Sequence, residues 1–311
     1  MNWKLKATVQ NIIDVLPSFL AYPVYEKVQR TLGALSTFRV VDPLAVCSFI
    51  VKSLKENGGD IVGKTVLEVG TGSRLDIPIG LWLSGASRII TVDLNPFLKK
   101  DLVRRHIDYI RNNRELVEES CPAVIDHAQV RSRYELLMRA DKDLNELMNL
   151  MNIEYLAPVD AARLSQISDC SVDVHFSTHV LEHIPPSTIE NIFREARRVL
   201  KKNGLIIHNV DLGDHCAYDD QTVTFVNFLQ FTEKVWGRWA GNRFMYHNRM
   251  RVFEYDTLFR KMCLEILSKE VVSDEASLAL LKNGFKVDAR FAFGTPEELS
   301  IKSLNITGRF I

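Results

Sequence analysis

Short apolar runs alternate with segments of helical periodicity through the middle of the chain. The apolar runs are TVLEVG, RIITVD, IEYLAP, SVDVHFS and NGLIIHNVD. One segment between them, PSTIENIFREARRVLKKNG, enters through prolines and is expected to form a helix closed by Asn203 and Gly204. Strands that alternate with crossover helices pair in parallel. The pattern therefore predicts an α/β fold with a doubly wound, mostly parallel sheet.

Residues 1–60 are predicted to form an N-terminal helical cap. The apolar positions of its first segment have the spacing of an amphipathic helix: Leu5, Val9, Ile12, Ile13 and Leu16. This helix is expected to end near Pro17, and another to begin at Asp42 with Pro43 in its first turn. The pattern leaves open whether these helices close over a ligand or form a homodimer interface.

Residues 61–311 are predicted to form one domain with two additions. Residues 95–150 carry charges at helical spacing, which indicates a helical insertion of two or three surface helices. Residues 212–255 lose this periodicity and are rich in aromatic residues, His and Asn, which is typical of a lid or substrate segment. The rest is expected to form a helix near EYDTLFRKM, a strand near LEILSKEVV, a helix near DEASLALLKNG and a strand near SIKSLNITGRF.

The charge balance and the cysteines narrow the class of protein. Lys and Arg total 39 and equal Asp and Glu at 39, so no net charge attracts nucleic acid or an anionic membrane, and a small-molecule partner is expected. Five dispersed cysteines form no C-x-x-C pair, which argues against disulfides and zinc and fits a cytoplasmic protein without a metal. No signal-peptide pattern or apolar stretch long enough to span a membrane is present in the sequence.

A glycine-rich turn follows the first apolar run, in TVLEVGTGSRLDIPIG. Gly70 and Gly72 allow a ligand to approach the backbone, and Asp93, 93 − 72 = 21 residues beyond the second glycine, is placed to accept hydrogen bonds from a ribose. A dinucleotide-binding turn would need a small residue where this chain has Leu75. Glu68 would oppose a phosphate and suit an ammonium group. The turn therefore favours a nucleoside ligand without a pyrophosphate.

The motifs LEVGTG, TVDLN and FSTHVLEHIP, in this order, resemble the class I S-adenosylmethionine-dependent methyltransferases. The resemblance implies a seven-stranded Rossmann-like sheet and S-adenosylmethionine as cofactor. It places the turn around the methionine part, Asp93 on the ribose, Asp160 with Ala161 at the adenine, and Ser177 to His179 beside the transferred methyl. The cofactor-binding residues that it implies are Glu68, Gly70, Thr71, Gly72, Asp93, Leu94, Asp160, Ala161 and Ser177. Arg74 stands where many relatives have a third glycine, and either narrows the methionine pocket or points to solvent.

The segment after the fifth apolar run resembles that of a loosely defined bacterial group of small-molecule or glycan methyltransferases. The matching residues are Asp214-His215 and the Asn-Arg-x-Arg motif at 248–251. Arg249 and Arg251 are interpreted either as solvated lid charges or as a clamp for an anionic acceptor. The aromatic residues of this segment either stack on the acceptor or pack the lid onto the sheet: Trp236, Trp239, Phe244 and Tyr246.

Methyl transfer is an in-line displacement, so catalysis depends mainly on positioning the reactants in a site that excludes water. A hydroxyl acceptor also needs a base, and histidine is the usual one. The base candidates are His179 and His183 after the fourth apolar run and His208 and His215 on or after the fifth. The predicted catalytic residues are His215, with Asp214 to orient it, His179 and His183, although His183 in LEHIP and His179 also fit a purely structural role in the loop. The leading hypothesis is methylation of a hydroxyl of a sugar, a glycan precursor or a secondary metabolite. A nicotinamide-dependent oxidoreductase and a non-catalytic cofactor-binding protein are the alternatives.

Overall fold

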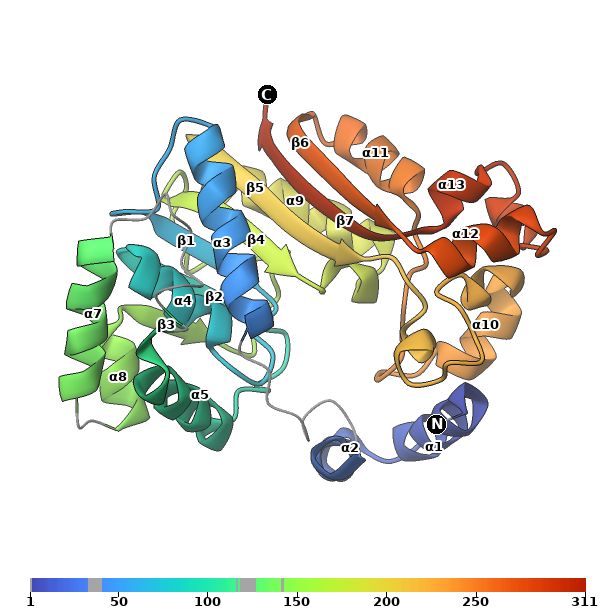
Figure 1. Ribbon diagram of the computed structural model, residues 1–311, viewed down its shortest axis with the longest axis horizontal. Helices are drawn as coiled ribbons and strands as arrows, with labels where there is room; N and C mark the ends of the chain where they lie inside the picture. Colours follow the sequence, from blue (N-terminus) through green and yellow to red (C-terminus); the bar gives the residue numbers. More distant parts are fainter. Residues whose placement is uncertain (1, 33–40, 116, 118–126, 141–142) are drawn as a thin grey trace.

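The computed structural model describes residues 2–32, 41–115, 117, 127–140 and 143–311. Cys121 lies outside this part of the chain. Apolar runs and helical segments alternate as the sequence predicts (Figure 1). The helices and strands up to the fourth strand are α1 (Trp3–Asp14), α2 (Ser18–Leu32), α3 (Val41–Glu56), β1 (Thr65–Val69), α4 (Asp76–Ser84), β2 (Arg88–Val92), α5 (Lys100–Asn112), α7 (His127–Arg139), α8 (Leu144–Leu150), β3 (Ile153–Leu156) and β4 (Val172–Thr178).

The second half of the chain contains the longer strands and the lid. Its elements are η1 (Leu181–His183), α9 (Pro186–Val199), β5 (Leu200–Asp211), η2 (His215–Tyr218), η3 (Asn227–Gln230), α10 (Glu233–Ala240), α11 (Val252–Lys261), β6 (Leu264–Ser273), α12 (Glu275–Lys282), η4 (Ala289–Phe291), α13 (Pro296–Leu299) and β7 (Ile301–Phe310). None of the described helices is both long and apolar enough to cross a bilayer.

The seven strands form one sheet in the order β3-β2-β1-β4-β5-β7-β6. The pairs from β3 to β5 are parallel, whereas β7 runs antiparallel to both β5 and β6. The predicted doubly wound, mostly parallel sheet is therefore confirmed. The direction in which successive strands are added to the sheet reverses between β1 and β4. In open α/β sheets a ligand binds at such a point, beyond the carboxyl ends of the strands.

Helices cover both faces of the sheet. Side chains of β1 alternate between two cores: Val66 packs with α3, α4, α5 and α7, while Leu67 packs with α9 and α11. The predicted region of charged helices between residues 95 and 150 contains α5, which is amphipathic. It buries Val103 and Ile107 in the first core and exposes its charged face. A third core joins Trp3 of α1 to the lid elements η2, η3 and α10 and to α12 beyond the lid.

One predicted boundary is wrong. The helix after LEHIP ends at Val199 rather than at Asn203 and Gly204, and β5 begins at Leu200. The reason is pairing: Leu200 already lies opposite Val172 of β4, and the register shifts before Leu205 joins Val174. The Lys-Lys-Asn-Gly segment is thus the irregular start of a strand. Pro23 also lies within α2 and does not end it.

Candidate active site

The glycine turn joins β1 to α4 and requires glycine at its first position. Gly70 has φ +89°, and a Cβ on it would lie 2.4 Å from Cγ2 of Val180. The turn is tied to the end of β2, because the amide of Gly72 donates to Oδ2 of Asp93 at 2.9 Å and the amide of Asn95 donates to Oδ1 at 3.0 Å. Burial raises the pKa of Asp93. Each carboxylate oxygen keeps a further acceptor position for a ligand.

A cavity of about 820 Å³ runs from this turn across the carboxyl ends of β1, β2 and β4. This volume lies within the range of roughly 300–1,000 Å³ that is usual for small-molecule sites. The cavity is lined by α2 (Tyr22, Tyr25, Glu26, Gln29), by the turns after β1, β2 and β3 (Val69, Gly70, Gly72, Ser73, Val92, Asp93, Leu94, Phe97, Lys99, Val159, Asp160, Ala161), by the segment from β4 to α9 (Thr178, His179, Val180, His183, Ile184, Pro185, Thr188, Ile192) and by the lid (Arg243, Phe244, Tyr246).

Six of the nine residues expected to bind the cofactor line this cavity: Gly70, Gly72, Asp93, Leu94, Asp160 and Ala161. The other three lie behind its wall. Thr91 donates to the Glu68 carboxyl at 2.5 Å and shares a 2.6 Å hydrogen bond with Thr71. Burial raises the pKa of Glu68 to about 8. Ser177 shares a 2.7 Å hydrogen bond with Nδ1 of His208. These three residues support the turn and β4, and their contact with a cofactor stays a prediction.

Arg74 takes a position that settles neither of its two interpretations. Its Nε lies 3.1 Å from Oδ2 of Asp76, whose other oxygen lies 2.8 Å from Nδ1 of His106. The guanidinium therefore pairs with the first residue of α4, and Arg74 is outside the cavity lining.

Two of the three candidate catalytic histidines, His179 and His183, line the same cavity as Asp93. His179 follows β4 with φ +53°, and His183 ends η1. The Nδ1 of His183 lies 2.9 Å from the carbonyl oxygen of Tyr246. Because a carbonyl can only accept, Nδ1 carries the proton and Nε2 keeps its lone pair. The imidazole is open to the cavity but crowded by protein on its other sides, and this desolvation, with the nearby His215 ring, lowers its pKa to about 4.

His215 stands behind His183, with the two ring centroids 5.0 Å apart. Its Nε2 lies 3.3 Å from Oδ2 of Asp211. Asp211 also accepts from the hydroxyl of Tyr218 at 2.7 Å and from the amide of Gly213 at 2.8 Å. Burial alone would raise the pKa of Asp211, but His215 and these donors outweigh it and lower the pKa to about 2.

The expectation that Asp214 orients His215 is wrong. Asp214 accepts from the amide of Cys216 at 2.9 Å and from Asn227 at 2.8 Å, so it caps η2 and holds the lid. The chain turns at Gly213, and this turn brings Asp211, at the end of β5, to the imidazole instead.

Comparison with known proteins matches a methyltransferase-domain family model to residues 132–208, which include β3, β4 and most of β5. No curated protein matches the chain. Among solved structures, geranyl diphosphate C-methyltransferase from Streptomyces coelicolor is 13% identical, with 85% of this chain and 79% of that chain covered and a TM-score of 0.46. A methyltransferase from Methanosarcina mazei is 16% identical (80% and 93% covered, TM-score 0.43), and one from Mesorhizobium loti is 12% identical (83% and 96% covered, TM-score 0.44).

The family match covers the strands that carry the third and fourth motifs, and the sheet order and the glycine turn agree with it. The chain is a class I S-adenosylmethionine-dependent methyltransferase. This assignment replaces both the nicotinamide-dependent and the non-catalytic alternatives. A Cβ on Gly72, which lines the cavity, would meet no atom within 4 Å, so the space beside the backbone of the turn fits a ligand held against it.

The Asn-Arg-x-Arg motif of the methyltransferase holds its lid in place, and both earlier interpretations of the two arginines are wrong. Arg249 is buried and donates to the carbonyls of Phe228 and Phe231 at 2.8 and 2.7 Å and to Glu233 at 2.6 Å. Arg251, 1% exposed, donates to three carbonyl oxygens, those of Leu212, Leu299 and Ile301. Asn248 donates to the carbonyls of Leu181 and Ile184 at 2.8 and 2.9 Å and so fixes the loop that carries His183.

The aromatic residues of the methyltransferase lid divide into two groups. Phe244 and Tyr246 line the cavity, whereas Trp236 and Trp239 pack against Trp3 with ring centroids 6.1 and 5.5 Å away. Sequence reasoning did not identify the contribution of α2. Tyr25 stacks on Phe244 at 4.1 Å, and Tyr22 meets the same ring edge-on at 5.9 Å. The available signal was the recurrence of residues 22, 25, 26 and 29 on one helix face.

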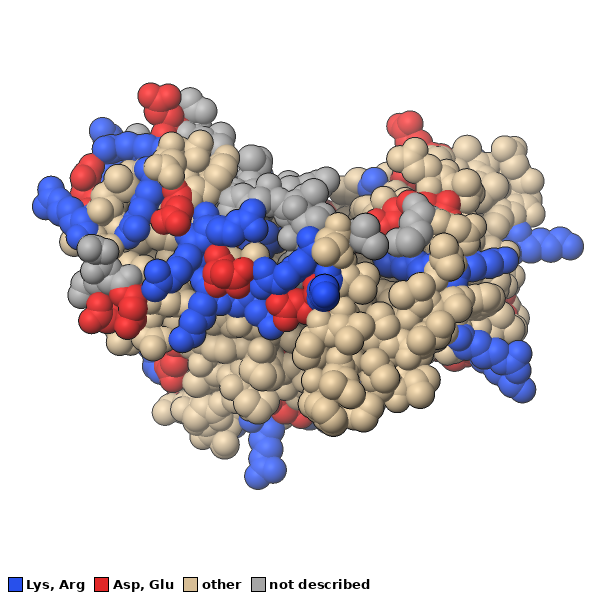
Figure 2. All heavy atoms as spheres, turned by 90° about the horizontal axis from the view of Figure 1, so that it is seen from below, with Lys and Arg blue, Asp and Glu red and all other residues tan. Residues whose placement is uncertain are grey.

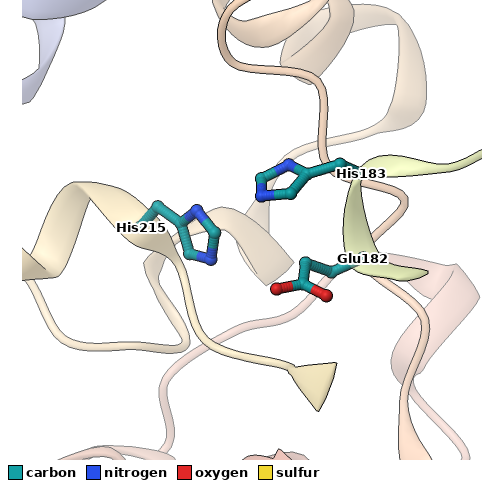
Figure 3. A group of neighbouring side chains, drawn as sticks. All are labelled: Glu182, His183 and His215. Atoms are coloured by element: carbon teal, nitrogen blue, oxygen red, sulfur yellow. The ribbon is translucent and has the colours of Figure 1, made fainter. Parts of the chain in front are cut away.

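Glu182, His183 and His215 also form a group that could hold a metal ion. One donor atom of each lies within 4.8 Å of the other two, and Figure 3 shows the side chains pointing toward one another from η1 and η2. Burial, with the charge of Asp211, holds the pKa of Glu182 well above its usual range. The same cluster therefore offers two uses to the methyltransferase, proton transfer through His183 or coordination of a cation, and these predict different responses to a chelator.

Proposed function

We propose that this methyltransferase transfers the methyl group to a hydroxyl oxygen of a small molecule bound in the cavity. The observation that carries the proposal is that one cavity is lined both by Asp93 and the glycine turn and by the imidazole of His183. We call the part lined by the turns after β1, β2 and β3 the cofactor end, and the part lined by α2, η1 and the lid the acceptor end. When bound, S-adenosylmethionine supplies an electrophilic methyl group on a positively charged sulfur. The residues at the two ends then have separate tasks, holding the cofactor and receiving the acceptor.

At the cofactor end, we assign ribose binding to Asp93 and the adenine edge to Asp160, Ala161 and Leu94. Asp93 is held by two backbone amides, so its oxygens are already oriented when a ribose arrives. The glycine turn admits the methionine part, and Glu68 supports this turn from behind.

At the acceptor end, we assign proton removal to Nε2 of His183. The hydroxyl proton passes to Nε2 as the oxygen–methyl bond forms and the methyl–sulfur bond breaks, which yields an ether, a neutral thioether and an imidazolium. The positive charge thus moves from sulfur to His183, where Asp211 favours it through the field of its carboxylate. His215 stands between the two as a positioning residue, and His179 contacts the acceptor from the end of β4.

The walls of the cavity support an acceptor with a ring. Tyr22, Tyr25 and Phe244 form an aromatic surface on one side of the cavity, and such rings stack on the apolar face of a sugar or on an aromatic nucleus. Acceptors of this kind are a sugar, a glycan precursor or a secondary metabolite with a free hydroxyl.

The first test separates the cofactor from the acceptor. Calorimetric titration with S-adenosylmethionine and with its demethylated product should give micromolar binding that Asp93→Ala abolishes, while Glu270→Ala, an exposed carboxylate on β6, leaves binding intact. Acceptor pools are then screened for the mass increase of one methyl group. Absence of donor binding by the intact protein would overturn the proposed roles at the cofactor end.

The second test addresses the base. Asn in place of His183 can still donate to the carbonyl of Tyr246 but cannot take a proton, so His183→Asn should lower kcat by about 10²- to 10⁴-fold and leave donor affinity unchanged. Equal turnover by wild type and variant would show that the acceptor needs no base, as expected for a carboxylate or a neutral amine.

A further inference from the structure

The N-terminal helices carry an unusual concentration of exposed apolar side chains. Val15, Phe19 and Ile12 are 85%, 74% and 65% exposed. We call the following set the apolar strip: Leu5, Val9, Ile12, Val15, Phe19, Leu20 and Val24. Single exposed apolar residues are common on protein surfaces, but a contiguous group marks a binding surface.

The apolar strip is not the face by which these helices attach to the protein. Trp3, Ala7 and Ile13 of α1 are buried, and Trp3 packs in the core of the lid. Tyr22 and Tyr25 of α2 face the cavity. One face of these helices therefore packs on the protein or lines the cavity, and the apolar strip lies on another face.

Basic side chains border the apolar strip. Exposed lysines and arginines lie on the helices themselves and at the start of α5, and we call this set the basic border: Lys4, Lys27, Lys100, Arg104 and Arg105. The start of α5 is held beside α2 by the ion pairs Arg30–Asp101 and Lys99–Glu26, at 2.7 and 2.6 Å. Figure 2 shows Lys and Arg, with Asp and Glu among them, next to a broad uncharged area on this side of the molecule.

Three acidic residues of the same region form ion pairs, whereas Asp143, beside α5, lies within reach of the charges of Lys100 and Arg104. Asp101 and Glu26 pair with Arg30 and Lys99, and Asp14 pairs with Arg243 at 2.6 Å. The chain has a net charge of zero, so any attraction of this face to an anionic surface has to come from the local distribution of its charges.

We propose that the apolar strip and the basic border dock this protein onto an anionic lipid surface. A helix that lies in a membrane interface needs an apolar face to enter the acyl boundary and cations beside it to meet the headgroups. Both are present, and with 12 and 15 residues α1 and α2 are too short to span a bilayer. A second copy of the chain would satisfy the strip but bring the same cations, whereas an anionic lipid surface complements both features.

Docking in this orientation places α2 between the lipid and the cavity. The proposal is independent of the acceptor chemistry proposed above, because it requires neither cofactor nor acceptor.

The test is co-sedimentation of the full chain with vesicles of phosphatidylcholine alone and with phosphatidylglycerol added. The triple variant Ile12→Glu, Val15→Glu, Phe19→Glu places charges only at exposed positions. Phe293→Glu is the matched control, because Phe293 is 71% exposed and lies between η4 and α13. Circular dichroism and donor binding confirm that each variant is folded.

We expect binding to the anionic vesicles that falls at least tenfold in the triple variant, weakens with added salt and is unchanged in Phe293→Glu. No binding of the wild type to anionic vesicles, or equal binding by the triple variant, would overturn the proposal. So would a dimer in sedimentation velocity that the triple variant dissociates, because the strip would then be a contact between copies.

Discussion

The two ends of the cavity are constructed in different ways. The cofactor end is held by backbone groups: it contains the glycine turn, two amides that fix Asp93, and the loops after β2 and β3. The acceptor end consists of side chains from segments far apart in the chain, with α2, η1 and the lid each adding part of the wall. The cofactor end depends on the backbone conformation of Gly70, whereas the acceptor end depends on buried side chains that hold remote segments of the chain together.

Two buried side chains of the lid, Arg251 and Asn248, hold remote segments together in this way. Arg251 joins the end of β5 to the segment before β7, and Asn248 joins the lid to the loop of His183. Neither side chain lines the cavity. Their substitution should therefore damage the acceptor end through the fold, whereas substitution at the glycine turn should damage the cofactor end without unfolding the protein.

The largest effect is expected at Arg251. Arg251→Met removes the donors of three carbonyl oxygens and should lower the free energy of unfolding by about 3–5 kcal/mol. Arg309→Met is the control, since Arg309 forms an exposed pair with Glu265 that is worth at most about 1 kcal/mol. Denaturant titration measures both. Equal losses in the two variants would mean that the buried guanidinium does not hold the lid.

The next effect is expected at the glycine turn. Gly70→Ala adds a Cβ 2.4 Å from Val180 at φ +89° and should weaken S-adenosylmethionine binding by about 10- to 100-fold. Gly284→Ala has almost the same backbone strain, at φ +88°, but its Cβ meets no neighbouring atom. Calorimetry of the two variants separates local crowding from strain. Unchanged affinity in Gly70→Ala would remove the turn from the cofactor site.

A smaller change is expected in the dependence of activity on pH. The pKa of His183 is lowered to about 4, so its neutral form, which can accept a proton, predominates at every pH above that value. The kcat/KM of the free enzyme should therefore vary little between pH 5 and pH 8 and fall only as the pH approaches 4. An inflection near pH 6.5 that His183→Asn removes would mean that His183 titrates as an ordinary histidine.

No effect is expected from chelation if His183 acts as the base. Dialysis against a chelator should leave both donor binding and turnover unchanged. Loss of turnover that a divalent ion restores would instead assign Glu182, His183 and His215 to a metal site, and His215→Ala should then abolish the restoration.

The sequence predicts the cofactor end better than the acceptor end for a physical reason. Strand periodicity and the glycine turn are local patterns; they predict a mostly parallel sheet, and the family resemblance that they support implies its seven strands. The partner of His215 depends on a turn at Gly213 that periodicity does not reveal, so the sequence indicates only the neighbouring Asp214 and not Asp211. The burial of Arg249 and Arg251 also has no local signal, because it depends on carbonyl groups contributed by lid and strand segments 18 or more residues away.

The ion pairs that hold α2 against the cavity have a consequence for the exchange of ligands. Glu26–Lys99, Arg30–Asp101 and Asp14–Arg243 all lie at the surface, where dissolved salt screens charges over about 10 Å at 0.1 M. The ion pairs that hold this wall of the cavity should therefore weaken as the ionic strength of the solution rises. Ligands should enter and leave the cavity faster in concentrated salt, so the residence time of the product is set partly by the medium.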